Sequence, residues 1–594
     1  MFRNNGVATA MTSRFHFVLL ISALLLCTSA FAFQSDPYGG NSAPGTSSVL
    51  GIPLKEPDTP PDRVTGQAEG GKQIEFKSQT TLVRVPVVVT DSSGGHLHQL
   101  SKSDFKVLED GKPQTIASFD EIIPDNSVRA ATPPSSNTFT NMTSDVSKAN
   151  SVVVMLIDKV NTPFLSQADA RRQLIKYLAD HLNSSQPMAL MAITGKGLRV
   201  LSPFGTDPKI LMAALKNVSG EVAPKEQFSD DSQIIVADGE QPIGLAAPIG
   251  INESPDHVIR RFTLAEDSVQ GAVTQQRTIE TTLRAFLQMA WSLSGVPGRK
   301  SVIWVTGSFP FYLENYTSVP GDPTLRALYE RVLKAFADAQ ISVYPVDARG
   351  LLTDSAYAGT SGVSFFGPDA SSQLDQSTFD SLKVFAKMTG GVAYYQTNDL
   401  AGAVDHAVED SSSYYLITYY LDRRNNKPGW RQLQVQVSRK DAKVRARAGF
   451  LVTNLAVNPE LSHKADVDFA LASPYESTGV RITEHWLGVA PSGDKKKVGF
   501  VVNVPAQDLI DESDKNRFDV EFIAQAERKG VAAGSVGQTI KGSAAPENLA
   551  KLKADGVLYR NSLELSPGDY QVRFIVRDNL TGRLGSVIVP LTVN

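Results

Sequence analysis

An aspartate, an asparagine and a threonine directly follow an apolar run, and their types and spacing suit ligand binding. Residues 152–157 read VVVMLI, which is typical of a strand buried on both faces of a parallel sheet, and Asp158, Asn161 and Thr162 come next. In open α/β sheets, ligands bind at the carboxyl ends of strands, near the point where strand order reverses. Carboxylate, amide and hydroxyl oxygens suit Mg²⁺ or Ca²⁺. The pattern equally fits a structural role, in which Asp158 caps the following helix or its own turn.

The elements that would position these residues form one expected α/β domain over 150–411. Apolar runs predict strands at 152–157, 188–194, 301–306, 341–346 and 391–395. Amphipathic patterns predict helices around 174–182, 279–290, 325–336 and 379–386, and after 399. Strands that alternate with helices predict a mostly parallel, doubly wound, Rossmann-like sheet. Residues 220–273 and 351–376 break the pattern and are expected to form long loops at its rim.

Units of β structure are expected on both sides of this domain. Alternating valines and the hairpin signal EDGK predict a small β domain over 76–123, followed by a linker over 124–149. Residues 412–455 are expected to extend the central domain with further strands. Residues 473–594 predict an immunoglobulin-like β-sandwich. Its clearest elements are strands at 498–504, 518–524, 571–577 and 586–593 and a short helix within 545–556.

The start of the chain predicts an exported protein. A basic start, an apolar core at 15–26 and an A-x-A motif indicate a signal peptide over 1–32, and a polar, Gly- and Pro-rich stretch over 33–75 predicts a disordered spacer. The single cysteine, Cys27, lies in the signal, so the mature chain has no thiol for a disulfide or a zinc site. No transmembrane span is expected after signal cleavage. A periplasmic, secreted or cell-surface location is therefore predicted.

Composition and motifs argue against two function classes. The formal net charge is −4 with no long basic block, which argues against a nucleic-acid-binding protein. The sequence has no G-x-S-x-G, H-E-x-x-H or P-loop motif, so we expect a protein that is not an enzyme. One alternative stays open, because Ser308 follows a predicted strand end and the members of a catalytic triad are distant in sequence.

The chain resembles a known family. The matching segments are VRVPVVVTDSSG, DFKVLEDGKPQTIASF, VVVMLIDKVNTP, GLRVLSPFGTD, PGRKSVIWVTGSFP, ISVYPVDARGL, and SSSYYLITYY followed by VRARAGF. On these segments, residues 76–452 resemble the exported von Willebrand factor A-related proteins of the acidobacterial type, and 150–410 resembles an A domain. The resemblance implies a domain that binds a protein or matrix partner at the carboxyl edge of its sheet.

Many A domains hold a divalent cation through a D-x-S-x-S motif, and the resemblance implies a degenerate form of that site here. Asp158 matches the first position and Thr162 the second serine, whereas Val160 has no ligand atom. The aspartate expected after the strand 301–306 is missing, because the sequence there reads Thr-Gly-Ser. Thr274, Thr278 and Thr281 are candidates for a loop threonine. Mg²⁺ or Ca²⁺ is therefore expected to bind weakly or not at all.

The leading hypothesis is an exported, non-enzymatic binding or adhesion module. Its predicted contact surface is an exposed cluster of Asp158, Asn161, Thr162 and Ser308, together with the loops 220–273 and 351–376. Its expected partner is a protein or an extracellular-matrix or envelope component. Two alternatives remain: a serine-dependent hydrolase, and a structural scaffold of the cell envelope in which Asp158 only stabilises a turn.

Overall fold

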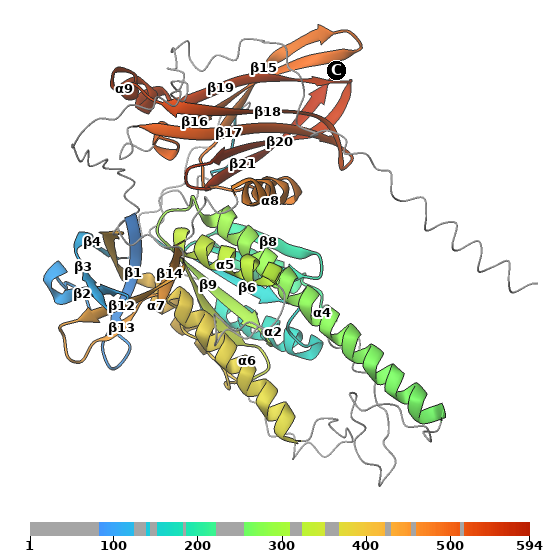
Figure 1. Ribbon diagram of the computed structural model, residues 1–594. Helices are drawn as coiled ribbons and strands as arrows, with labels where there is room; N and C mark the ends of the chain where they lie inside the picture. The colour runs from blue at the N-terminus through green and yellow to red at the C-terminus, as the bar shows by residue number, and fades with distance from the viewer. Residues whose placement is uncertain are drawn as a thin grey trace, which may run out of the picture. The chain divides into compact units, whose positions relative to one another are not determined.

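The structure is a computed structural model, and it describes most of the chain after residue 81 (Figure 1). The described residues are 82–123, 138–142, 151–181, 186–220, 255–308, 323–350, 368–421, 429–452, 459–510 and 516–594. The predicted signal peptide (1–32) and spacer (33–75) lie outside them. The fold is mixed α/β.

A five-stranded sheet lies at the centre of the α/β domain, in the order β10-β9-β6-β7-β8. Its strands are β6 (Ser151–Asp158), β7 (Met188–Thr194), β8 (Gly197–Gly205), β9 (Arg299–Thr306) and β10 (Ile341–Asp347). Four strands are parallel, as the sequence predicts, and β8 runs antiparallel to β7 at the edge. Because β6 has β7 on one side and β9 on the other, Asp158 ends the strand at which the order reverses.

The expected strand at 391–395 is wrong. Among the described residues, this segment makes one isolated bridge, between Tyr394 and Val346 of β10. It approaches β10 through Gly390, which has a positive φ of 85°, and Gly391, where a Cβ would lie 1.9 Å from the carbonyl oxygen of Val343. The chain therefore crosses close to β10 and does not form a ladder with it.

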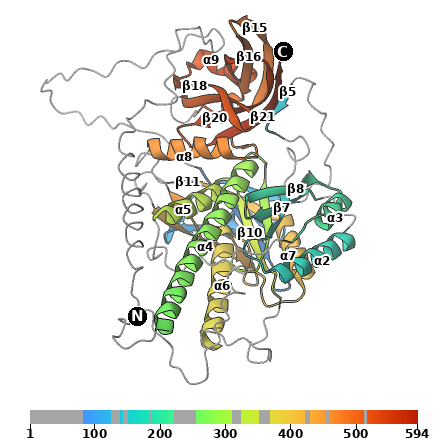
Figure 2. The same ribbon diagram turned by 90° about the vertical axis from the view of Figure 1, so that its right-hand side faces the viewer.

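Helices cover both faces of this sheet (Figure 2). They are α2 (Phe164–Asp180), α3 (Pro208–Lys216), α4 (Pro255–Leu293), α5 (Pro323–Asp338), α6 (Pro368–Thr389) and α7 (Leu400–Ser412). One core joins the sheet to α4, α5 and α6, and a second joins its other face to α2, α3 and α7. The expected loops at 220–273 and 351–376 are partly wrong, because α4 and α6 begin inside them at prolines, which favour the first position of a helix.

A second unit, made of two four-stranded sheets, combines strands that precede the α/β domain in the sequence with strands that follow it. Their orders are β13-β1-β11-β4 and β14-β12-β2-β3. The strands are β1 (Leu82–Thr90), β2 (Phe105–Glu109), β3 (Lys112–Gln114), β4 (Ile116–Ile122), β11 (Tyr414–Tyr420), β12 (Gly429–Val437), β13 (Lys443–Arg445) and β14 (Gly449–Val452). The predicted hairpin is confirmed, with positive φ at Asp110 and Gly111 between β2 and β3. Residues 412–455 therefore do not extend the central sheet; their strands pair with those of 82–122 around one apolar core.

The C-terminal β unit also contains two four-stranded sheets around a shared core, in the orders β19-β16-β15-β5 and β18-β17-β20-β21. Its elements are α8 (Pro459–Ala472), β15 (Thr483–Ser492), β16 (Lys495–Val504), β17 (Arg517–Arg528), β18 (Val531–Ser543), α9 (Pro546–Asp555), β19 (Val557–Leu565), β20 (Gly568–Asp578) and β21 (Leu584–Val593). All four strands predicted here and the short helix are confirmed. The predicted linker 124–149 is corrected, because β5 (Thr138–Thr140) lies inside it and pairs with β15.

Candidate functional site

Asp158 lies where the sequence places it in the sheet, but it is not exposed. Its exposed fraction is 0%, and Asn161 and Thr162 are also buried. The predicted exposed cluster is therefore wrong. The physical reason is that β6 is a central strand, so the polar groups of β9 reach its carboxyl end and close over it.

Five donor groups surround the Asp158 carboxylate. The backbone N–H groups of Val160 and Asn161 donate to Oδ1 at 3.1 and 3.0 Å, which forms the turn after β6. Three side chains lie at Oδ2: Asn161 Nδ2 at 2.7 Å, Trp304 Nε1 at 3.0 Å and Thr306 Oγ1 at 3.1 Å. The Thr306 hydroxyl also lies 2.9 Å from the carbonyl oxygen of Ser308, so its single proton is shared between two acceptors.

Burial dominates the electrostatics of this carboxyl group. Desolvation raises the pKa of Asp158 from 3.8 to about 6, while the hydrogen bonds from Asn161, Trp304 and Thr306 act in the opposite direction and limit the rise. The carboxylate is therefore mainly ionised at neutral pH. Hydrogen bonds from N–H and O–H groups stabilise its charge.

The other predicted residues complete the same hydrogen-bond network. Asn161 Nδ2 also donates to Thr282 Oγ1 at 2.9 Å, and Thr282 donates to the carbonyl of Thr278. Thr162 Oγ1 accepts the backbone N–H of Gly307 at 3.0 Å. The end of β9 is thus bonded to the turn after β6, which fixes both.

This arrangement does not fit a divalent cation. The Asp158 oxygens together accept five N–H and O–H groups and Thr162 Oγ1 accepts an N–H, so these oxygens are largely engaged. The buried Asn161 Oδ1 has no hydrogen-bond partner among the described residues, but one neutral amide oxygen is a poor site for an ion that binds several oxygen ligands. No acid can be added at 307 without a shift, because a Cβ there would lie 2.7 Å from Cδ of Pro163 and 3.0 Å from the Asn161 carbonyl oxygen. Within the described part of the chain, no group of three or more His, Cys, Asp or Glu side chains is placed to hold a metal ion.

Ser308 lies at the end of β9 with its hydroxyl directed back into the protein. Its Oγ donates to the carbonyl oxygen of Asn161 at 3.3 Å. Among the described residues, no histidine hydrogen-bonds to it. No described histidine is therefore hydrogen-bonded so as to activate this hydroxyl as a nucleophile.

The same edge of the sheet has exposed apolar side chains that the sequence analysis did not single out. Leu165 is 81% exposed and Phe164 is 45% exposed, in the first turn of α2, directly after the Asp158 turn. The buried side chain of Gln167 stabilises this turn, because its Nε2 donates to the carbonyl oxygens of Thr162 and Lys159 at 2.8 and 3.1 Å. A hydrogen-bonded turn thus presents Leu165 to solvent, next to Phe164, whose ring lies against Gly220.

Two residues important to the Asp158 network were missed, Trp304 and Thr282. Trp304 belongs to an apolar run that gives no sign of a polar role, although an indole N–H in a buried strand needs a partner. Thr282 is one residue beyond the last candidate threonine, on the face of α4 that also carries Ile279, Leu283 and Phe286. The sequence signal that could have identified Thr282 is its polar side chain on the apolar face of a predicted helix.

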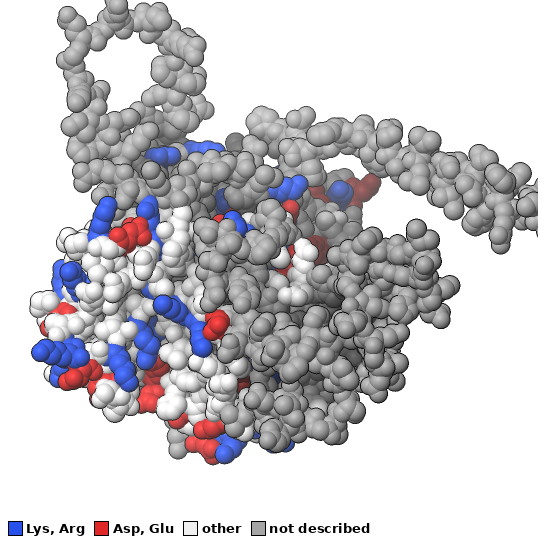
Figure 3. Space-filling view, turned by 60° about the horizontal axis from the view of Figure 1, so that its bottom comes forward, with Lys and Arg blue, Asp and Glu red and all other residues white. Residues whose placement is uncertain are grey.

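Charge on the surface shown in Figure 3 is mixed, with Lys and Arg side chains among Asp and Glu on the described part of that face.

No helix of the described residues combines the length and the apolar character needed to cross a membrane.

Comparisons with known proteins give only distant structural similarities. No family model matches the chain, and no curated protein sequence matches it. The similar solved structures include the N-terminal domain of TFIIH p34, at 13% identity and a TM-score of 0.19, over 43% of this chain and 96% of that one. They also include the SpRpn10 VWA domain, at 14% identity and a TM-score of 0.13, over 33% and 89% of the two chains. A third is the human COPII-coat protein Sec24c, at 10% identity and a TM-score of 0.17, over 77% and 46%.

Proposed function

We propose that the chain is an exported, non-enzymatic binding module, and that its α/β domain binds a protein partner at the carboxyl edge of the sheet without a metal. The single observation that carries this proposal is Leu165, an apolar side chain that is 81% exposed in the helix turn that directly follows the Asp158 network. Exposed apolar side chains on a rigid support are typical anchors of protein interfaces. The proposed contact replaces the exposed polar cluster of Asp158, Asn161, Thr162 and Ser308 that the sequence predicted, because the first three of these residues are buried.

The finer fold assignment belongs to the same proposal. The sheet order, with four parallel strands and one antiparallel edge strand, supports an A-type domain, and the two packed sheets at the C-terminus support an immunoglobulin-like sandwich. A domains mostly bind proteins or matrix components. A partner from the cell envelope or the extracellular matrix is therefore the one we propose.

The test compares two exposed apolar residues at opposite edges of the sheet. Leu165 lies at the carboxyl edge, whereas Ile210, 59% exposed on α3, follows the end of β8 at the amino edge. We would immobilise the mature chain and the variants Leu165→Asp and Ile210→Asp, and capture proteins from envelope and culture fractions with and without a chelator. Each captured protein would then be purified and titrated.

We expect a partner whose affinity falls by roughly tenfold or more in Leu165→Asp, as for a central apolar anchor. Binding should be unchanged in Ile210→Asp and in the presence of chelator. A partner lost equally in both variants would contradict the use of this edge, and loss on chelation would contradict the metal-independent mechanism. Labelling of Ser308 by an active-site serine probe would support the hydrolase alternative instead.

A further inference from the structure

The strand β5 reaches the C-terminal sheet from a segment that precedes the whole α/β domain in sequence. Thr138, Phe139 and Thr140 pair antiparallel with His485, Glu484 and Thr483 of β15. β5 is the edge strand of that sheet, and Phe139 packs against the core between the two sheets. The sheet is thus extended by three residues that are not part of the C-terminal segment.

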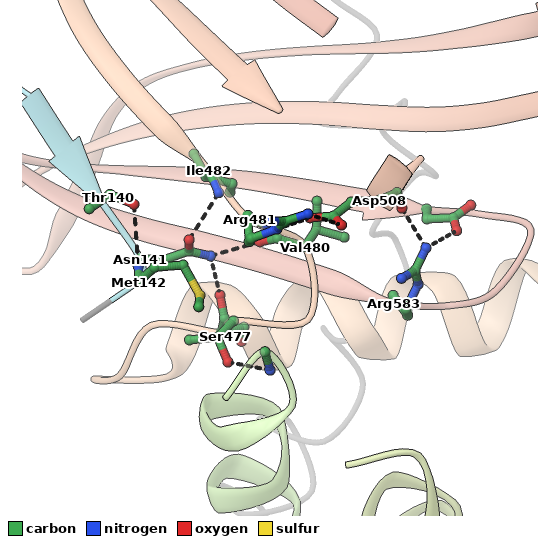
Figure 4. Close-up of polar contacts among 12 residues, drawn as sticks. Thr140, Asn141, Met142, Ser477, Val480, Arg481, Ile482, Asp508 and Arg583 are labelled. Carbon is green, nitrogen blue, oxygen red and sulfur yellow. Dashed lines mark hydrogen bonds and ion pairs between the residues drawn. The ribbon is translucent and has the colours of Figure 1, made fainter. Parts of the chain in front are cut away.

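The residue after β5 makes the most specific contacts. Asn141 is buried, and its Nδ2 donates to the carbonyl oxygens of Ser477 and Val480 at 2.7 and 2.8 Å (Figure 4). Its Oδ1 accepts the backbone N–H of Ile482 at 2.9 Å. Both amide protons and the amide oxygen are therefore used, a set that neither a carboxylate nor an aliphatic side chain can reproduce.

The segment 477–482 that receives Asn141 is held by other contacts as well. Arg481 forms a two-point ion pair with Asp508, with Nε–Oδ2 and Nη2–Oδ1 distances of 2.9 Å (Figure 4). The backbone is also packed closely against Gly585, where a Cβ would lie 2.0 Å from the carbonyl oxygen of Val480. Thr478 accepts the backbone N–H of Gly295, at the end of α4, at 2.8 Å. These contacts hold in place the backbone groups to which Asn141 hydrogen-bonds.

We infer that the edge of β15 that β5 covers and the segment 477–482 together form a peptide-binding site. It accepts an extended strand followed by an asparagine, and its resident ligand is this chain's own segment 138–141, bound in cis. Main-chain pairing along a sheet edge supplies affinity, as in other cases of strand addition, and the asparagine supplies specificity.

The small size of the contact explains why the site is occupied by a segment of the same chain. Three paired residues and the bonds of one amide give only a modest affinity for a free peptide, because each hydrogen bond formed replaces one to water. The covalent connection raises the effective concentration of the segment to roughly the millimolar range and keeps the site filled. A free peptide is therefore excluded from the native chain and binds only when the resident segment is weakened.

The test uses the full-length chain with the site emptied by Phe139→Ser and Asn141→Gly. A fluorescently labelled peptide with the sequence of residues 136–143 is titrated by anisotropy, beside a control peptide that differs only by Asn141→Asp. We expect saturable binding of the first peptide to the emptied chain, at least roughly tenfold weaker binding of the control, because two amide donations are lost, and little binding of either to the native chain.

Equal binding of both peptides, or none to a folded emptied chain, would overturn the inference. If the emptied chain does not fold, the single variant Asn141→Asp replaces it, and the readout becomes an increase in its Tm on addition of the native peptide; no increase counts against the site. Sedimentation of the native chain tests the cis assignment, since dimers that form with rising concentration and disappear in Asn141→Asp would assign the segment to a second copy.

Discussion

Two buried carboxyl groups, Asp158 in the α/β domain and Glu484 in the C-terminal β unit, are both 0% exposed but differ in their surroundings. Asp158 ends a strand, where the backbone N–H groups of the following turn are free to bond to it. Glu484 lies inside a strand that is paired on both sides, with Val502 and Phe139, so the neighbouring backbone groups are engaged in the ladder. Neither of its carboxyl oxygens has a hydrogen-bond partner among the described residues.

The difference appears in the two pKa values. Burial raises the pKa of Asp158 to about 6 against the opposing effect of its hydrogen bonds, whereas burial alone raises the pKa of Glu484 from 4.5 to about 8. At neutral pH the first group is mainly an anion that organises a turn and the second is mainly a neutral acid. In this pair, the difference follows from the position of the acid along its strand. At a strand end, backbone N–H groups are free to bond to a buried carboxylate, whereas inside a paired strand they are not, and burial of the acid then costs stability.

The largest expected effect comes from removing the paired acid. Asp158→Ala leaves buried N–H and O–H groups without an acceptor, including those of Asn161 and Trp304, so we expect a loss of about 3–5 kcal/mol in the free energy of unfolding. Urea denaturation measures it. The control is Asp169→Ala, a half-exposed acid on α2 that pairs with Arg172 and accepts a hydrogen bond from Gln173, which should change stability by about 1 kcal/mol or less. Similar losses in both variants would show that the hydrogen bonds of Asp158 do not stabilise the fold more than an ion pair near the surface does.

Neutralising the unpaired acid should have the opposite effect. Between pH 4.5 and about 8 the unfolded state releases the Glu484 proton while the folded state retains it, so native stability falls as pH rises through this window. Glu484→Gln removes this dependence. At roughly 1.4 kcal/mol per pH unit, the variant should be more stable than the native chain by about 3 kcal/mol at pH 7.

Unfolding midpoints measured from pH 4 to pH 9 test this prediction. The two proteins should agree most closely near pH 4 and diverge as the pH rises. The control is Glu547→Gln at an exposed position on α9, which should follow the native chain at every pH. A constant difference between Glu484→Gln and the native chain would show that the carboxyl group does not titrate as described.

A smaller effect is expected when a single donor is removed from the Asp158 network. Thr306→Val deletes the hydroxyl at Oδ2 with little change in shape, and we expect a loss of about 1 kcal/mol, because Asn161 and Trp304 still donate to that oxygen. The matched control is Thr90→Val, since the buried Thr90 hydroxyl has no partner among the described residues. It should be neutral or stabilising, and an equal loss in both would contradict the role of Thr306.

The smallest expected effect is that of divalent metal. Millimolar Mg²⁺ or Ca²⁺, or a chelator, should leave the Tm of the native chain unchanged to within about 1 °C, because a ligand that does not bind the native state cannot stabilise it. Thermal unfolding with Asp158→Asn as the comparison measures this. An increase in Tm that requires Asp158 would show that the carboxylate exchanges its N–H donors for a cation.

Local sequence determined much of this fold. Apolar runs located the four parallel strands of the central sheet but not its edge strand β8. The EDGK hairpin required positive φ at Asp110 and Gly111, and the run ending at Asp158 correctly marked the strand at which sheet order reverses. These features depend on short-range preferences: the period of burial, turn chemistry and strand length. They are legible in one sequence because the residues that cause them are neighbours.

Only the tertiary structure decided the features that join distant segments. Asp158 is closed off by Trp304 and Thr306, 146 and 148 residues further along the chain. The expected linker contributes β5 to a sheet more than 300 residues away, and Asn141 reads backbone groups there that no side-chain pattern reveals. Whether an oxygen-rich turn meets water or N–H donors depends on the neighbouring strand in space, which sequence periodicity does not specify.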